Sequence, residues 1–444
     1  MTSAASVRYE RTKLRLSADP LAAMARLAGC GLYADYVVYE NEGCWTFAAG
    51  VLAEVTAHRD GAALRYDGTT VTEASDDPLT AVGDLLASIP VDGWRAYGWA
   101  AFELAYALAG DRDEVGAERL VHLFVPRTEV RVEHGWAFLR SVDRTALDEA
   151  VAALASTDDP VRGVPHPMDV QQGGGPDYQQ AVKLAVEEIN ARHLQKVILS
   201  RSVEVQEPID FVATYVCGRR GNRPARSFLV RLDGVEAAGF SPEIVVQVDT
   251  DGRVVSQPLA GTRALTADPK TNARLRGELQ TDAKEIFEHA ISVKAACEEL
   301  QPVCVPDSLA VEEFMAVRER GSVQHLASRV AGRVLPGRQA WDCFRAVFPA
   351  VTASGLPKLS AYRSIRRHET RNRGLYSGAV LMLDQAGAMD AALVLRAVHR
   401  RDGRTWLQAG AGLVEQSTPD REFEETCEKL RSVAQFLVRA VPEQ

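Results

Sequence analysis

Two segments of the sequence each carry a pair of glutamates three residues apart: Glu285 with Glu288, and Glu422 with Glu425. Residues at this spacing lie on one side of a helix, so each segment, if helical, presents both carboxylates together. Four carboxylates that converge from two helices would offer the oxygen ligands that magnesium prefers. Two simpler interpretations stay open: glutamate-rich helix faces are commonly solvated, and Lys284 with Glu288 would also suit an i, i+4 ion pair.

A lysine begins the apolar run Lys196-Val-Ile-Leu. Its neighbours predict partial burial, and a lysine buried among apolar side chains can serve as a base. The alternative is a lysine that protects an edge strand from pairing with another chain. The tripeptide Gly410-Ala-Gly412 follows an expected strand over 405–409. Small residues there would let backbone N–H groups approach an anion, or would form only a tight turn.

Hydrophobic periodicity predicts the elements that must position these residues. Helices are expected over about 178–193 and 273–300, and a last helix has Thr418 as N-cap and Pro419 in its first turn. Both glutamate pairs then lie beside an apolar stripe. Lys196 starts an expected strand and points to the side opposite Val197.

The N-terminal part of the sequence predicts an antiparallel sheet without a catalytic constellation. Short apolar runs at 36–39, 45–48 and 121–125 alternate with Gly and Asp turns, and helices are expected near 79–88 and 146–155. A stretch rich in Pro and Gly, from 156 to 176, predicts a surface connection. It divides the chain into a scaffold part, about 1–170, and a larger part, about 176–444.

Composition narrows the classes of function. The 444 residues are 46% hydrophobic and 25% charged, as in a soluble globular protein, and the net charge of −9 disfavours nucleic-acid or membrane partners. A small anionic substrate would therefore need a local cationic pocket. The N-terminus lacks the pattern of a signal peptide, no apolar run reaches membrane-spanning length, and the seven scattered cysteines form no CxxC pair. We expect a cytoplasmic protein.

Short motifs in the larger part resemble, in their order, those of the chorismate-utilising enzymes, which include anthranilate, aminodeoxychorismate, isochorismate and salicylate synthases. The motifs cover residues 196–201, 239–243, 258–263, 284–289, 320–326, 348–358, 374–378, 395–396, 410–412 and 422–429. Within the family the pattern is most similar to the salicylate synthases of mycobactin-type siderophore pathways.

The resemblance implies one α+β unit over residues 1–444, with central antiparallel sheets, outer helices and an active site in a deep cleft. The two parts of the chain would then be a scaffold subdomain and a catalytic subdomain. It also implies chorismate as the substrate, Mg²⁺ as the cofactor, a monomer, and no glutamine amidotransferase subunit.

The resemblance further implies the site residues. Mg²⁺ would be bound directly by Glu288 and Glu425, and through water by Glu285 and Glu422. His325 would position the substrate or assist elimination. The residues implied to bind the substrate are Gly261, Thr262, Thr352, Ala353, Tyr376, Leu395, Arg396, Gly410, Gly412 and Lys429.

Lys196 and Glu243 imply which reaction of the family takes place. Ammonia-adding relatives lack a lysine at the position of Lys196, because ammonia needs no base, whereas water does. Lys196 would deprotonate water for attack at C2, and Glu243 would protonate the departing C4 hydroxyl, giving isochorismate. Ala260 agrees with this assignment, because relatives that form a covalent adduct carry lysine there.

Three pocket residues concern the fate of isochorismate. Thr352, Ala353 and Tyr376 match the salicylate synthases, which eliminate pyruvate to give salicylate. The alternatives are an isochorismate synthase that releases its product and a non-catalytic relative that only binds chorismate-like ligands. Gln257 departs from the glutamate found in similar salicylate synthases.

Overall fold

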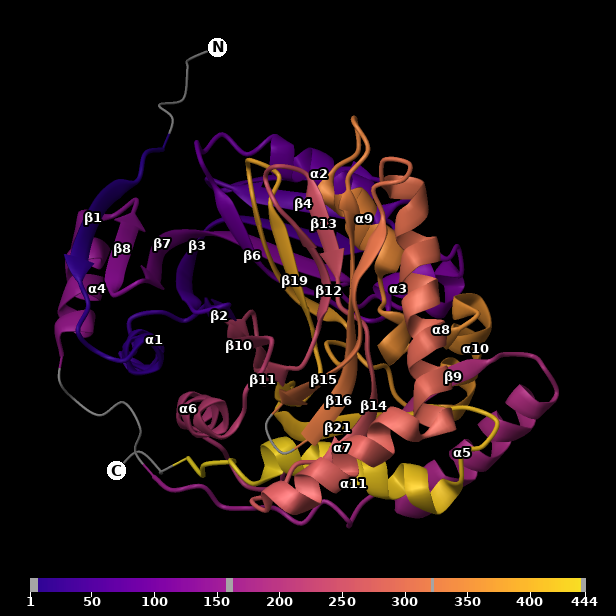
Figure 1. Cartoon of the computed structure of the whole chain (residues 1–444). Helices are drawn as coiled ribbons and strands as arrows, with labels where there is room; N and C mark the ends of the chain where they lie inside the picture. Colours follow the sequence, from indigo (N-terminus) through magenta and orange to yellow (C-terminus); the bar gives the residue numbers. More distant parts are fainter. Residues whose placement is uncertain (1–6, 157–162, 321–322, 441–444) are drawn as a thin grey trace.

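Antiparallel strands form the centre of the protein, and helices lie outside them (Figure 1). The computed structural model describes residues 7–156, 163–320 and 323–440. Part of the predicted 156–176 connection, two residues of the 320–326 motif and the N-terminal residues 1–6 lie outside this range. The strands are β1 (Glu10–Arg15), β2 (Tyr36–Asn41), β3 (Cys44–His58), β4 (Gly61–Tyr66), β5 (Thr69–Ala74), β6 (Arg95–Ala100), β7 (Val121–Glu133), β8 (Trp136–Ser141), β9 (Lys196–Glu204), β10 (Arg226–Leu232), β11 (Val235–Ser241), β12 (Ile244–Val248), β13 (Arg253–Ser256), β14 (Leu259–Ala264), β15 (Ala310–Arg320), β16 (Val323–Arg333), β17 (Gly355–Leu356), β18 (Ala379–Asp384), β19 (Met389–Leu393), β20 (Ala397–Arg401) and β21 (Arg404–Leu413).

The helices interrupt this strand order at intervals. They are α1 (Pro20–Gly29), α2 (Pro78–Ala87), α3 (Leu104–Leu108), α4 (Arg144–Ala155), α5 (Gly175–Asn190), α6 (Phe211–Gly221), α7 (Pro269–Thr281), α8 (Ala283–Leu300), α9 (Ala340–Val347), α10 (Lys358–His368) and α11 (Pro419–Ala434), with the short 3₁₀ turns η1 (Arg112–Glu114), η2 (Gln301–Val303) and η3 (Val351–Ala353).

The strands pair in two runs that share β3 and β7. One run is β5-β4-β3-β7-β6-β18-β19-β12-β13-β16, with β14 and β15 also beside β16. The other is β1-β8-β7-β3-β2-β10-β11-β20-β21-β9-β17. Every one of these ladders is antiparallel. Strands from the N-terminal and C-terminal parts of the chain therefore lie side by side, as β6 with β18 and β2 with β10.

An irregularity in the two longest strands separates the runs. The register of β3 against β7 shifts between Val51 and Ala53, and Val51 faces Pro126, which has no N–H to give to the ladder. The first half of β3 therefore belongs to one run and the second half to the other. Side chains from both runs share a buried cluster that includes Tyr39, Trp99 and Phe228.

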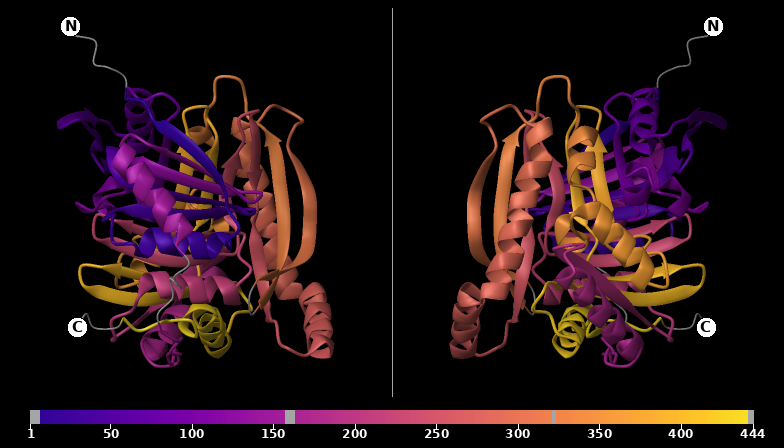
Figure 2. Two further views of the ribbon diagram at one scale, coloured as in Figure 1. Left: turned by 90° about the vertical axis from the view of Figure 1, so that its left-hand side faces the viewer. Right: turned by 90° about the vertical axis from the view of Figure 1, so that its right-hand side faces the viewer.

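Helices cover the outer faces of the two runs. α2, α8 and α9 pack on the first run, α1, α4, α6 and α11 pack on the second, and α5 and α10 contact β9. Figure 2 shows the ribbon of β15 and β16 along one edge of the molecule, with α7 near its end. No helix among the described residues is long and apolar enough to cross a membrane.

The predicted helix over 273–300 was wrong, because the chain forms two helices that meet at Asp282. Its side chain accepts hydrogen bonds from the backbone N–H groups of Lys284 and Glu285 and so caps α8. The apolar stripe continues across this break, so periodicity alone could not reveal it. Gly410-Ala-Gly412 lies within β21 and not after it. Thr418 is the N-cap of α11, as predicted.

Candidate active site

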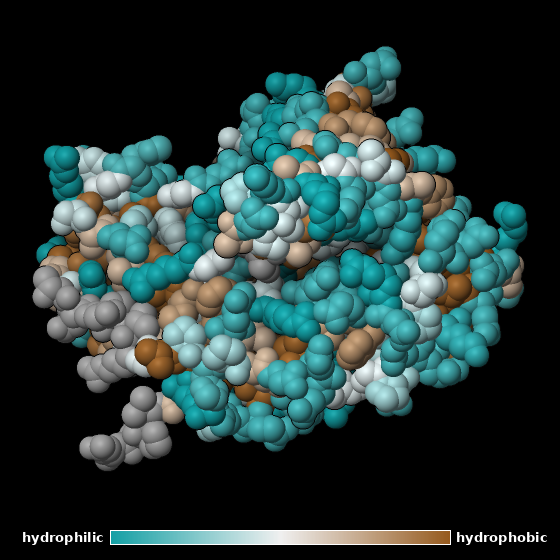
Figure 3. Space-filling view, turned by 60° about the horizontal axis from the view of Figure 1, so that its bottom comes forward, coloured by the Kyte–Doolittle hydropathy of each residue, from teal (hydrophilic) through white to brown (hydrophobic). Residues whose placement is uncertain are grey.

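One cavity gathers most of the predicted site residues. It lies between β14, β21, α8, α11 and η3, and it is lined by all the predicted site residues except Lys196, Glu285 and Glu422. Ile198 on β9 and Pro242 after β11 also line it. Figure 3 shows the molecule turned so that the bottom of Figure 1 comes forward. This face is mostly hydrophilic and is hollowed near its centre.

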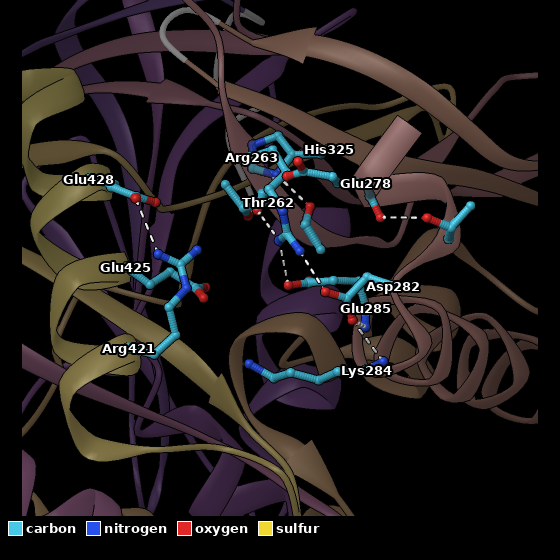
Figure 4. A network of polar contacts seen from close by, with 12 residues as sticks. Thr262, Arg263, Glu278, Asp282, Lys284, Glu285, His325, Arg421, Glu425 and Glu428 are labelled. Carbon is cyan, nitrogen blue, oxygen red and sulfur yellow. Dashed lines mark hydrogen bonds and ion pairs between the residues drawn. The ribbon is translucent and has the colours of Figure 1, made fainter. Parts of the chain in front are cut away.

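The four glutamates on α8 and α11 are buried, so the prediction of solvated helix faces was wrong. Each forms an ion pair with a different cation: Glu285 with Arg263 at 2.8 Å, Glu288 with Lys196 at 3.0 Å, Glu422 with Lys284 at 2.8 Å, and Glu425 with Lys429 at 2.8 Å. The i, i+4 pair of Lys284 with Glu288 was also wrong, because the Lys284 ammonium contacts Glu422 on the other helix. Figure 4 shows Arg263 pointing to Asp282 and Glu285, across from Arg421 and Glu425.

The carboxylates also act on one another. Burial and the charges of Glu288 and Glu425 raise the pKa of Glu285, while burial and the charge of Glu425 raise the pKa of Glu422. Burial opposes ionisation of Glu425 as well, but Lys429 and Lys284 outweigh it and hold its pKa below the usual value. One oxygen of Glu422, Oε2, is buried without a hydrogen-bond partner. This excess of buried carboxylate oxygen suits a hard cation.

Glu288 and Glu425 are the residues that could hold such a cation, because both line the cavity. Within the described ranges, no three His, Cys, Asp or Glu side chains are grouped closely enough to surround a metal ion by themselves. Magnesium in proteins usually keeps several waters and is bound by one or two carboxylates together with substrate oxygens. Two carboxylates facing one cavity fit that mode of binding.

Glu243, just after β11, is fully buried and accepts two hydrogen bonds. Thr352 Oγ1 donates to Oε1 at 2.7 Å, and the backbone N–H of Leu259 donates to Oε2 at 2.6 Å. Both bonds favour the carboxylate, yet burial outweighs them and raises the pKa of Glu243 to about 7. The side chain therefore retains a proton well into the neutral range, as a general acid requires.

Lys196 is completely buried, and its strand is not at an edge. β9 pairs with β21 on one side and with β17 on the other, so the prediction of an edge-strand lysine was wrong. The ammonium group lies 3.0 Å from Glu288 Oε1 and donates a hydrogen bond of 3.1 Å to Ser292 Oγ. Ser292 in turn donates to the carbonyl oxygen of Glu288. Lys196 therefore lies directly behind a carboxylate that lines the cavity.

His325 and Arg396 form a buried pair in the cavity wall. A guanidinium only donates hydrogen bonds, so His325 Nε2 accepts from Arg396, and the ring proton belongs on Nδ1, 3.1 Å from the carbonyl oxygen of Gly261. Burial and Arg396 hold the pKa of His325 well below its usual value, which keeps the ring neutral. Arg396 has a φ of 50°, a strained value for a residue other than glycine. The pairing with His325 holds the Arg396 guanidinium at the cavity wall.

Two glycines of β21 leave room for other site residues. A Cβ atom at Gly412 would lie 2.2 Å from Glu288 Oε1, and one at Gly410 would lie 3.0 Å from the Tyr376 hydroxyl. The small residues of the 410–412 motif thus admit a carboxylate and a phenol to the cavity. Burial raises the pKa of Tyr376, so its hydroxyl stays protonated and can donate to an anion.

Sequence reasoning missed the partners of these side chains. Arg263, Lys284 and Ser292 each contact a predicted site residue, and none was assigned a role. The first two lie inside the motifs 258–263 and 284–289, so membership of a motif was the signal available for them. Ser292 carries no such signal.

A cavity lined by buried acids, a lysine and an arginine among antiparallel strands defines an enzyme that acts on a small anion. Residues 35–435 match the family of chorismate binding enzymes, and the chain belongs to this family. It is an enzyme that acts on chorismate. The predicted resemblance and the predicted α+β fold are therefore confirmed.

Relatives and solved structures resemble the chain over most of its length. It is 41% identical to a salicylate synthase of Mycolicibacterium paratuberculosis, over 91% of this chain and 90% of that protein. It is 32% identical to an anthranilate synthase component 1 of Halobacterium salinarum, over 83% and 79% of the two chains. The menaquinone-specific isochorismate synthase MenF of Escherichia coli has the same fold, with a TM-score of 0.75, 23% identity and coverage of 97% and 96%.

Proposed function

We propose that this protein is a salicylate synthase that converts chorismate first to isochorismate and then to salicylate and pyruvate. One observation carries the proposal: Glu243, with its raised pKa, faces the same cavity that Lys196 adjoins from behind Glu288. An acid and a lysine at one cavity suit the exchange of a hydroxyl group for water. The likeness to a salicylate synthase over nine-tenths of both chains supports the choice of product.

The substrate is a dianion, and the cavity supplies its counter-charges. Arg396 and Lys429 line the cavity, and the proposal assigns Arg396, together with the Tyr376 hydroxyl, to the side-chain carboxylate. In this proposal Glu288 and Glu425 would hold Mg²⁺ near the ring carboxylate, and Glu285 and Glu422 would support the ion through water. Bound Mg²⁺ supplies the positive charge that lets the ring carboxylate lie among glutamates.

In the first step Lys196 takes a proton from water, and the oxygen forms a bond to C2. Both ring double bonds shift, from C1=C2 to C1=C6 and from C5=C6 to C4=C5, the C4–O bond breaks, and Glu243 donates its proton so that the hydroxyl leaves as water. One water is consumed and one is released. A proton must then return from Lys196 to Glu243 before the next turnover.

In the second step the C2 hydrogen of isochorismate passes to the methylene carbon of the side chain while the C3–O bond breaks. Pyruvate leaves, and the ring becomes aromatic. No protein proton is needed, so the protein must mainly hold a reactive conformer. Thr352, Ala353 and Tyr376 line the cavity where that conformer would lie.

Several other features are proposed with this function. The chain would be one domain whose scaffold and catalytic subdomains meet near residues 170–176, and it would act as a cytoplasmic monomer without an amidotransferase subunit. Salicylate would serve siderophore or natural-product biosynthesis.

Product analysis tests the proposal. Purified protein is incubated with chorismate in the presence of Mg²⁺ or of EDTA, and the products are separated by chromatography, with salicylate detected by fluorescence. We expect salicylate and pyruvate in equal amounts with Mg²⁺ and neither with EDTA. Isochorismate as the only product would instead make the protein an isochorismate synthase. The variant K196A should lose water addition, and normal isochorismate formation by it would remove the base assignment.

A further inference from the structure

Arg373 lies behind the cavity and contacts two parts of its wall. Its side chain is only 1% exposed. Nη1 donates a hydrogen bond of 2.8 Å to the carbonyl oxygen of Ala353 on η3, and Nη2 donates one of 2.7 Å to the carbonyl oxygen of Ile198 on β9. Ala353 and Ile198 both line the cavity. One guanidinium therefore ties together two wall segments that are distant in sequence.

The same guanidinium contacts a third wall residue. Its central carbon lies 5.7 Å from the ring centroid of Tyr376, which lines the cavity, and 4.5 Å from that of Phe102. Cations attract aromatic faces at these distances. The position of the Tyr376 ring thus depends on a side chain that does not itself reach the cavity.

Arg373 is in turn held by two buried carboxylates. Glu369 accepts hydrogen bonds from Nε at 2.9 Å and Nη2 at 2.5 Å, and it also accepts one from the backbone N–H of Ser200 at 2.7 Å. Glu103 accepts from the backbone N–H of Arg373 at 2.7 Å. A buried guanidinium held by this many partners has one orientation, because every alternative leaves a charged group without a partner.

We infer that Arg373 is a positioning residue that fixes the wall formed by Ile198, Ala353 and Tyr376, and thereby holds isochorismate for pyruvate elimination. The inference rests on the proposed function. Water addition depends on Lys196 and Glu243, whereas elimination depends on the conformer that the wall imposes. A displaced wall should therefore slow elimination more than it slows the first step and let isochorismate escape.

Any buried arginine contributes to stability, so the test needs a matched control. Arg201 is also buried: it donates to Thr426 at 2.8 Å and to the carbonyl oxygens of Gly173 at 3.0 Å and Val170 at 2.8 Å, and it stacks on Phe423 at 4.6 Å. None of these partners lines the cavity. R201M removes a comparable network without touching the wall.

The experiment compares wild type, R373K, R373M and R201M. For each we would measure the ratio of released isochorismate to salicylate, KM and kcat for chorismate, and unfolding in urea. We expect R373M to slow salicylate formation about 10²-fold, the loss that a displacement of about 1 Å can cause. The ratio of released isochorismate to salicylate should rise by up to about 10²-fold, because release competes with the slowed elimination. R373K, which keeps the charge but not the forked geometry, should fall between R373M and wild type. R201M should unfold more easily yet keep the wild-type product ratio.

Equal product ratios in folded R373M and R201M would overturn the inference and leave Arg373 a purely structural residue. If R373M does not fold, the product ratios of R373K and E369Q test the inference instead, because E369Q keeps the arginine but weakens its hydrogen bonds to residue 369. Failure of the proposed function is a separate result: wild type would then make no salicylate. In that case the elimination role falls with the proposed function, and KM for chorismate tests only whether Arg373 fixes the wall: a displaced wall predicts a raised value in R373K and an unchanged one in R201M.

Discussion

Replacing Glu243 by glutamine should abolish turnover and stabilise the protein at the same time. Burial raises the pKa of this carboxyl from 4.5 to about 7, and a difference of this size corresponds to about 3 kcal/mol. Because the folded-state pKa is the higher one, the protonated Glu243 side chain contributes its full stabilisation to wild type below about pH 4.5. This contribution is lost as the pH rises to about 7. Glutamine does not titrate, so it escapes this loss.

The hydrogen bonds of the site suit the substitution. In E243Q the side-chain oxygen can accept from the Leu259 N–H, and the side-chain amide can donate to the Thr352 hydroxyl, which turns to accept. Urea unfolding of both proteins should give equal stabilities near pH 4.5 and an advantage for E243Q of about 3 kcal/mol near pH 8. Turnover of chorismate by E243Q should fall at least about 10²-fold, because the amide has no proton to give.

Glu103 provides a contrast for this prediction. It is also buried, and burial raises its pKa to about 7, but its two oxygens accept from the backbone N–H groups of Arg373 and Gly374. Glutamine there would set an amide N–H against a backbone N–H, so E103Q should destabilise the protein. A stability difference between E243Q and wild type that did not change with pH would refute the burial argument. Near-normal turnover by E243Q would refute the role of Glu243 as acid.

Three further predictions concern the site and its supports. The protonated fraction of Glu243 should fall about tenfold per pH unit above about pH 7; an infrared band of its protonated carboxyl group, identified by its loss in E243Q, that persisted unchanged to pH 9 would contradict this. G412A should abolish turnover, since the new Cβ would lie 2.2 Å from Glu288 Oε1, whereas G277A, with open space around it, should turn over normally. D282A should lower the free energy of unfolding by about 1–2 kcal/mol through loss of the cap of α8, and unchanged urea unfolding would show that the cap is dispensable.

The sequence was sufficient for features that depend on local spacing. The glutamate pairs 285/288 and 422/425 lie on helices, as the apolar periodicity predicted, and each pair shares one side because helical geometry relates residues three apart regardless of the rest of the fold. The N-cap at Thr418 was predicted for the same reason. The motifs identified the family, because their order along the chain is itself sequence information.

Only the tertiary structure decided which charges meet and which side chains lose water. Lys284 pairs with Glu422 across 138 residues, and no local pattern distinguishes that pair from the i, i+4 pair that the sequence suggested. The break at Asp282 was hidden because its capping bonds compete with a continuous helix of the same apolar period. The raised pKa of Glu243 and the contacts of Arg373 arise from burial among segments that are remote in sequence. Desolvation and ion pairing depend on distances through space, and these are fixed only when the strands and helices pack together.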